Sequence, residues 1–258
     1  MIIDAHLHCP FGKMDVDELK RECEKILYEF GRSGIDKSCV MHCGGYGTFY
    51  HDAAAQLELA ECLVKIIEMF PDKFYALLTL NGMLPANILI GALDKYIVKG
   101  PLTGVKFTIQ MNARDKRLEE VARFIEKHDI PVLWHCWYKT THKYPLESDP
   151  RDVSYFARKF PRIRILMAHL TGCGRRGVQD IKDCPNVLID TSGSQPYDGY
   201  LDYALKALGP DRVLYGSDYP CRDIPTQLGR VYASELSPEV REKVLCVNAL
   251  KFYTKKGN

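Results

Sequence analysis

Met1-Ile2-Ile3-Asp4-Ala5-His6-Leu7-His8 opens the chain with an apolar, β-branched start that ends in two histidines. The pattern predicts a strand, in which residues i and i+2 point to the same face. His6 and His8 would then project together from the end of the strand, close enough to share a metal ion. Alone, a His-x-His pair is equally compatible with two core histidines that satisfy hydrogen bonds. The rest of the chain decides between the two interpretations.

Short apolar segments alternate with longer amphipathic segments from this start to the end of the chain. Strands are predicted near residues 2–6, 37–42, 74–80, 103–108, 130–135, 163–168, 187–190 and 213–217. Helices are predicted near residues 16–32, 54–70, 86–99, 115–128, 150–160, 177–184, 199–208, 225–234 and 238–247. Eight strand–helix units in 258 residues are typical of a (β/α)8 barrel. We therefore predict an α/β fold, a TIM barrel with a single domain over residues 1–258.

One glycine-rich stretch favours a different architecture, an open doubly wound sheet. Gly172-Cys173-Gly174-Arg175-Arg176-Gly177 matches the G-x-G-x-x-G fingerprint of dinucleotide-binding folds, and Asp190 ends the next predicted strand. However, the glycines come late in the chain, and the helix predicted after them is short and weakly apolar. We therefore interpret the stretch as a glycine-rich barrel loop, whose arginines either face an anionic substrate group or are solvated.

The composition argues against several classes of partner. The net charge is +2 and there is no basic block, which disfavours nucleic acid or an anionic membrane as the partner. No apolar run reaches the length of a transmembrane span, and the strand predicted at residue 2 has no basic n-region before it. We expect a cytoplasmic protein that acts on a small molecule, with a homo-oligomer as an open option.

The ten cysteines are interpreted as reduced thiols. The chain is too long to depend on disulfides for its core, and it contains no C-x-x-C pair. A His-Cys pair follows an apolar residue three times, at Leu7-His8-Cys9, Met41-His42-Cys43 and Trp134-His135-Cys136. These cysteines either ligate a metal or, as we prefer, fill space at strand ends as small side chains.

Polar residues end three of the later strands. His135 follows the apolar segment 130–134, His169 follows 163–168, and Asp218 follows 213–217. Barrel enzymes place their chemistry at the carboxyl ends of the strands, which all lie at one rim. Buried His and Asp side chains are costly unless they are paired or bound to a metal. Together with the first two histidines, these residues make a metal site the preferred interpretation.

The order of these motifs resembles the amidohydrolase superfamily, with His-x-His, His, His and Asp at strands 1, 5, 6 and 8. Its amidohydrolase-related branch contains the aminocarboxymuconate-semialdehyde-type decarboxylases. The segments that resemble this branch are Ile3-Asp4-Ala5-His6-Leu7-His8, Gly104-Val105-Lys106-Phe107, Ala168-His169 and Gly216-Ser217-Asp218-Tyr219-Pro220. The resemblance spans nearly the whole chain, and no metal-ligand position of the pattern is missing.

The resemblance implies one divalent metal ion, Zn²⁺ in the first place, with Mn²⁺ or Fe²⁺ as substitutes. The ligands would be His6, His8, His135 and Asp218. The metal would lower the pKa of a bound water to about 7. His169 would serve as a general acid/base beside that water, and Asp218 would also accept the proton of the water. Asp4, on the same strand face as His6, would either support the site or make a structural hydrogen bond.

Lys106 leaves the number of metal ions open. In binuclear members of the superfamily a lysine on strand 4 is carboxylated and bridges two ions, but the Gly-Val-Lys-Phe context resembles the mononuclear branch. A free Lys106 ammonium would instead bind a substrate carboxylate. Trp137 and Arg222, predicted in loops beyond strands 5 and 8, would help to bind a flat or aromatic substrate that bears this carboxylate.

Three functions remain open on the sequence alone. The leading prediction is a metal-dependent hydrolase of a C–N or C–O bond, which acts through an activated water. The alternative is a metal-dependent, non-oxidative decarboxylase of an aromatic or unsaturated carboxylic acid, since one barrel supports both reactions. A metal-binding or regulatory barrel without turnover is disfavoured because His169 accompanies a complete ligand set.

Overall fold

The computed structural model describes residues 1–9, 12–42, 53–141, 143–195 and 197–254. Eight strands form one sheet in which neighbours along the chain are also neighbours in space, and all pairings are parallel. The strands are β1 (Ile3–His8), β2 (Lys37–Met41), β3 (Phe74–Leu80), β4 (Gly104–Phe107), β5 (Val132–Trp134), β6 (Ile165–Met167), β7 (Val187–Asp190) and β8 (Val213–Leu214). The order confirms the (β/α)8 prediction and rules out the doubly wound sheet.

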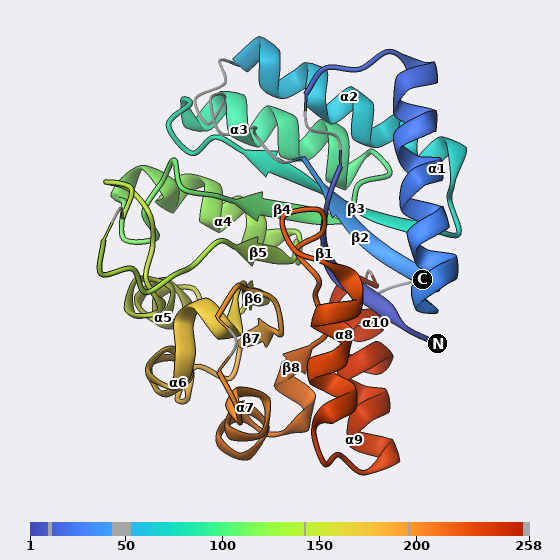
Figure 1. Ribbon diagram of the computed structural model, residues 1–258. Helices are drawn as coiled ribbons and strands as arrows, with labels where there is room; N and C mark the ends of the chain where they lie inside the picture. Colours follow the sequence, from blue (N-terminus) through green and yellow to red (C-terminus); the bar gives the residue numbers. More distant parts are fainter. Residues whose placement is uncertain (10–11, 43–52, 142, 196, 255–258) are drawn as a thin grey trace.

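Helices follow the strands around the outside of the sheet (Figure 1). The α-helices are α1 (Val16–Ser33), α2 (Ala53–Met69), α3 (Ala86–Leu93), α4 (Glu119–Lys127), α5 (Pro150–Lys159), α6 (Leu170–Ile181), α7 (Tyr200–Leu208), α8 (Ile224–Ala233), α9 (Pro238–Glu242) and α10 (Asn248–Tyr253). α1 begins with a capping box between Asp15 and Glu18 and ends at Gly34 in the left-handed conformation. No helix among the described residues is long and apolar enough to cross a membrane.

The barrel closes through the chain that follows β8. The backbone N–H of Ala5 donates to the carbonyl of Tyr215 at 2.9 Å, and that of Asp218 donates to the carbonyl of His6 at 2.7 Å. An isolated parallel bridge joins Leu7 and Tyr219 further along. The carboxyl end of β8 therefore lies directly beside the two histidines of β1.

Two apolar layers follow from the alternation of side chains along each strand. The larger layer packs between the strands and the outer helices, with Val105, Trp134 and Met167 among its members. The smaller layer contains alternate residues of the same strands, such as Leu133 and Leu166, together with residues of α10. Because polar side chains continue this inner set at the carboxyl ends of the strands, the site lies at one end of the barrel.

The glycine-rich stretch is part of a helix, so its interpretation as a loop was wrong. α6 begins at Leu170, directly after His169, and contains Gly172-Cys173-Gly174-Arg175-Arg176-Gly177. Gly174 interrupts the helix with φ 66° and ψ −171°. His169 has a φ of 71°, and the chain turns there from β6 directly into α6. The helix was not predicted at these residues because the glycine-rich segment has a low helix propensity. Both arginines are exposed and lie over tyrosine rings.

Candidate active site

His6 and His8 lie on one face of β1, as the strand period requires, and their Nε2 atoms are 3.2 Å apart. Asp218 joins them from the loop after β8. Its Oδ1 is 3.1 Å from His8 Nε2 and 3.6 Å from His6 Nε2. The hydrogen bond from its backbone N–H to His6, together with a φ of 62°, turns the carboxylate toward the histidines.

The spacing of these three atoms fits a metal site. Ligand atoms about 2.1 Å from a common ion, at angles of roughly 90–110°, are about 3.0–3.4 Å from one another. The three observed separations of 3.1–3.6 Å lie at or near this range. A grouping of His6, His169 and Asp218, all buried, is also close enough to hold an ion. Two imidazoles and a carboxylate form a donor set that suits Zn²⁺ and other first-row divalent ions.

Asp190, at the end of β7, prepares His6 as a ligand. Its Oδ2 is 2.8 Å from His6 Nδ1, and both side chains are fully buried. Burial and the nearby Lys106 lower the pKa of His6 to about 4, so the ring is neutral at pH 7. Because Nδ1 carries the proton toward Asp190, the lone pair of Nε2 faces the cluster. Burial alone would raise the pKa of Asp190, but His6 outweighs it and lowers this pKa to about 2.

His169 lies beside the cluster and is tied to the same carboxylate. Its backbone N–H donates to Asp190 Oδ1 at 2.9 Å, and its Nδ1 is 2.9 Å from Ser192 Oγ, which in turn donates to Asp190. Asp218 Oδ2 lies 3.9 Å from Nδ1 of His169. Burial lowers the pKa of His169 well below its ordinary value. The imidazole is therefore neutral near pH 7 and within reach of the Asp218 carboxylate.

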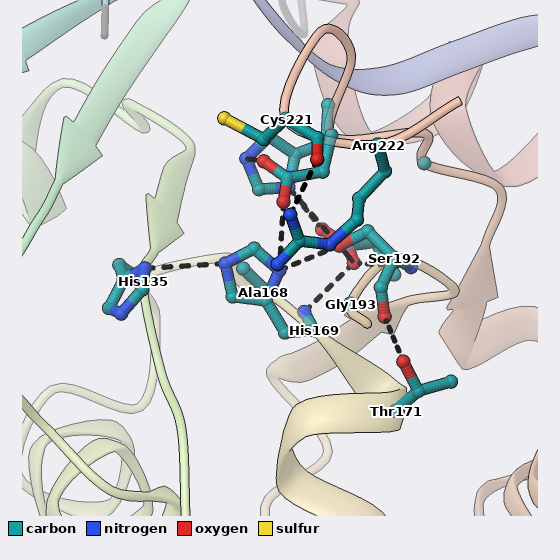
Figure 2. Close-up of polar contacts among 12 residues, drawn as sticks. His135, Ala168, His169, Thr171, Ser192, Gly193, Cys221 and Arg222 are labelled. Carbon is teal, nitrogen blue, oxygen red and sulfur yellow. Dashed lines mark hydrogen bonds and ion pairs between the residues drawn. The ribbon is translucent and has the colours of Figure 1, made fainter. Parts of the chain in front are cut away.

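His135 contacts His169 but does not belong to the close groupings that contain the other predicted ligands. Its Nδ1 is 3.2 Å from His169 Nε2, while its Nε2 is 2.7 Å from Glu147 Oε1. Figure 2 shows the contact between the two rings as a dashed line. The structure thus brings His6, His8, Asp218 and His169 together and places His135 at the edge of this set.

The predicted substrate-binding residues differ in their distance from the cluster. Lys106 is buried, and its Nζ is 3.0 Å from His6 Nε2, so a metal ion bound at that nitrogen would replace this hydrogen bond. The Trp137 ring lies 5.0 Å from the His169 ring. Arg222 donates from Nη1 to the carbonyl of Cys221 at 2.5 Å and follows Asp218 closely in the chain.

Comparison with known proteins identifies the family to which the chain belongs. The family model described as amidohydrolase matches residues 89–255. This chain belongs to the amidohydrolase family. No curated protein matches it.

Solved structures share the fold of this amidohydrolase along its whole length. The 5-carboxyvanillate decarboxylase from Sphingomonas paucimobilis is 15% identical with a TM-score of 0.77, and the match covers 98% of each chain. The 4-oxalomesaconate hydratase from Rhodopseudomonas palustris is 16% identical with a TM-score of 0.74, and the match covers 98% of this chain and 95% of the hydratase chain. A dihydroxybenzoic acid decarboxylase from a Polaromonas species, solved with manganese and 2-nitroresorcinol, is 14% identical with a TM-score of 0.72, and 98% of this chain covers 96% of that one.

Three residues around the candidate site were not predicted from the sequence. Asp190 was noticed only as a partner for the glycine-rich stretch, although it ends a strand as the predicted ligands do. Ser192 and Glu147 lie in loops, where no local pattern distinguishes them. Asp4, in contrast, has a structural role, since it accepts hydrogen bonds from Ser217 and from the backbone of the strand.

The described cysteines of the amidohydrolase are free thiols, and all except Cys221 are buried. A hydrogen bond to Cys23 and burial raise the pKa of Cys9, and burial raises that of Cys136. Neither thiol is therefore ionised at neutral pH, which agrees with small side chains that fill space at strand ends. Cys43 lies outside the described residues.

Proposed function

We propose that this member of the amidohydrolase family is a metal-dependent, non-oxidative decarboxylase of a small aromatic or unsaturated carboxylic acid. The observation that carries the proposal is a buried lysine, Lys106, whose Nζ lies 3.0 Å from His6 within the imidazole–carboxylate cluster. A cation at this depth, next to donors for a divalent ion, suits a substrate carboxylate better than a neutral group. Structural similarity to decarboxylases over 98% of the chain supports the same reaction.

The metal would be a single divalent ion. We assign His6, His8, His135 and Asp218 as its ligands. Zn²⁺ is our first choice, and Mn²⁺, present in one structural neighbour, is the main substitute. An ion bound there would act as a Lewis acid on the oxygen atoms of the substrate.

Substrate binding is assigned to three side chains at the rim. Lys106 would attract the carboxylate, and the Trp137 ring, beside His169, would pack on a flat substrate. Arg222, which follows the β8 loop, would bind a second polar group of the substrate. The three together favour a planar acid over a flexible aliphatic one.

Proton transfer is assigned to His169 and Asp218. When the bond between the carboxylate and its carbon breaks, CO₂ leaves and the bonding electrons remain on the carbon. That carbon then takes a proton from solvent, which the His169 ring would relay while the Asp218 carboxylate, 3.9 Å away, stabilises the transient imidazolium. Water need not take part in this bond cleavage.

Hydrolysis of a C–N or C–O bond is the second candidate. It is favoured by Asp218: burial would raise the pKa of this carboxyl, but the surrounding imidazoles hold it below its ordinary range. The resulting carboxylate is a ready acceptor for a proton from an attacking water.

A cytoplasmic location is also proposed here, from the free thiols and the near-neutral charge.

One experiment separates the candidates. The metal-loaded protein is incubated in H₂¹⁸O with a panel of hydroxybenzoates and unsaturated acids labelled with ¹³C at the carboxyl group, and with matched amides and esters. Release of ¹³CO₂, with one proton gained by the product, supports decarboxylation. Incorporation of ¹⁸O into the product of an amide or ester supports hydrolysis instead. Absence of both across the panel, with metal bound, would favour a barrel without turnover.

A further inference from the structure

Glu147 is a buried carboxylate outside the predicted site. It lies in the segment between β5 and α5, and its side chain is fully buried. Its backbone N–H donates to the carbonyl of Tyr144 at 3.1 Å, while the backbone of the adjacent Ser148 accepts from Trp137 at 3.2 Å. These bonds hold the two ends of the segment together and fix the position of Glu147 independently of its side chain.

The Glu147 carboxylate has three polar partners. Oε1 is 2.7 Å from His135 Nε2 and 2.8 Å from Lys139 Nζ, and Oε2 accepts from the backbone N–H of Tyr144 at 3.2 Å. A buried carboxylate is costly unless such partners compensate for lost water. Glu147 therefore presents an ionised acceptor to the His135 ring.

The contact determines which nitrogen of His135 faces the cluster. An imidazole nitrogen next to a carboxylate carries a proton, because a bare lone pair there would be repelled. Nε2 is thus the protonated nitrogen in a neutral ring, and Nδ1 is the bare one. Nδ1 faces His169, from which it is separated by 3.2 Å. His169 in turn contacts Ser192 and Asp218.

We propose that Glu147 is a positioning residue for His135. Its carboxylate accepts the Nε2–H of His135, holds the ring in one orientation and directs the bare Nδ1 toward the cluster. Glu147 does for His135 what Asp190 does for His6, from a loop rather than from a strand. The proposal rests on the proposed function for one point only, the assignment of His135 as a metal ligand. The orientation of the His135 ring can be measured without substrate, so its test does not depend on the reaction.

The tautomer of His135 tests this directly. Full-length protein labelled with ¹⁵N at histidine is freed of metal, and two-bond ¹H–¹⁵N spectra are recorded, with His135→Asn to assign the signals. We expect a protonated Nε2 in the parent protein and in Glu147→Gln, whose amide oxygen still accepts a hydrogen bond. In Glu147→Leu, which has no acceptor, the Nε2–H preference should be lost. Lys139→Met is the matched control, because it removes the other partner of the same oxygen and should leave the tautomer unchanged.

Zinc affinity gives a second readout. Competition with a chromophoric chelator should show Zn²⁺ bound about 10–100-fold more weakly by Glu147→Leu, the usual effect of removing such a partner. Glu147→Gln should recover part of this loss. A protonated Nδ1 in the parent protein overturns the proposal even if no variant folds. So does a folded Glu147→Leu with the parent tautomer and the parent affinity. Lack of decarboxylation affects neither measurement.

Discussion

His6 Nδ1 and Asp190 Oδ2 are 2.8 Å apart and fully buried, although 184 positions separate them in the chain. The same carboxylate accepts hydrogen bonds from the backbone of His169 and from both the backbone and the hydroxyl of Ser192. One side chain at the end of β7 therefore orients imidazoles that come from β1 and β6. Two of its partners, His169 and Ser192, are labelled in Figure 2, so the site depends on Asp190 as well as on the predicted ligands.

Asp190→Asn should weaken metal binding without unfolding the barrel. The amide keeps the shape of the side chain but loses the charge that stabilises the Nδ1–H tautomer of His6. We expect Zn²⁺ affinity to fall by about 10–100-fold, measured by chelator competition. Asp183→Asn, an exposed acid just before β7, is the control and should bind as the parent does. Equal affinities in the two variants would show that Asp190 has no part in metal binding.

Protein purified without chelators should contain about one divalent ion per chain. The reason is the close set formed by His6, His8 and Asp218, together with the sequence context of Lys106, which resembles the mononuclear branch. Elemental analysis by mass spectrometry measures the ratio. Two ions per chain, with a carboxyl group added to Lys106, would contradict this and indicate a bridged binuclear site.

His169→Asn and His135→Asn should separate acid/base chemistry from metal binding. Asn tolerates the positive φ of His169, so the turn into α6 should persist. We expect His169→Asn to keep most of its metal and lose roughly 10²–10⁴-fold in turnover. His135→Asn should lose metal as well as activity. If His169→Asn loses its metal and His135→Asn keeps it, His169 is the ligand and His135 is not. The close grouping of His169 with His6 and Asp218 allows this outcome.

Asp218→Asn should retain metal but abolish activity. The positive φ at this position suits Asn, and the amide oxygen can still coordinate beside the imidazoles. The negative charge and the proton acceptor are both lost. Turnover should fall below about 0.1% of the parent value. A metal-loaded variant within about tenfold of the parent would exclude Asp218 from proton transfer and leave His169 as the remaining group.

Gly172→Ala should disturb Trp137 and destabilise the barrel rim. A Cβ at position 172 would lie 2.6 Å from the Trp137 ring, which stands beside His169. We expect a loss of about 1–3 kcal/mol in the free energy of unfolding, measured with urea, and a lower kcat/KM for planar substrates. Gly229→Ala is the control: it lies in α8 with open space around it and should stabilise by about 0.5–1 kcal/mol. A Gly172→Ala protein as stable as the parent would show that the ring has room to move.

Most of the fold was predictable from local patterns. All eight predicted strands are present, with ends that differ by a few residues, because each buried strand needs an apolar run with a turn after it. The failure at Gly172–Gly177 has a definite cause. Three glycines lower the helix propensity of the segment, yet packing against Trp137 and a turn at His169 impose a helix there.

Four members of the close site, His6, His8, His169 and Asp218, were also predictable, since each follows an apolar strand and the strand ends of a barrel meet at one rim. Lys106 belongs with them for the same reason. Glu147 was not predictable, because the segment after β5 has no repeating pattern that says which residue turns inward. His135 was placed on the correct strand, but its orientation depends on that loop.

The sequence by itself determined the eight-unit barrel and the residue types available at its carboxyl rim, because both depend on short-range alternation along the chain. Only the tertiary structure decided which nitrogen of each imidazole faces the cluster. Asp190 orients His6, Ser192 contacts His169, and Glu147 contacts His135. The physical reason is that a tautomer is set by a hydrogen bond to a second residue, and these partners lie on other strands and loops that come together when the barrel closes.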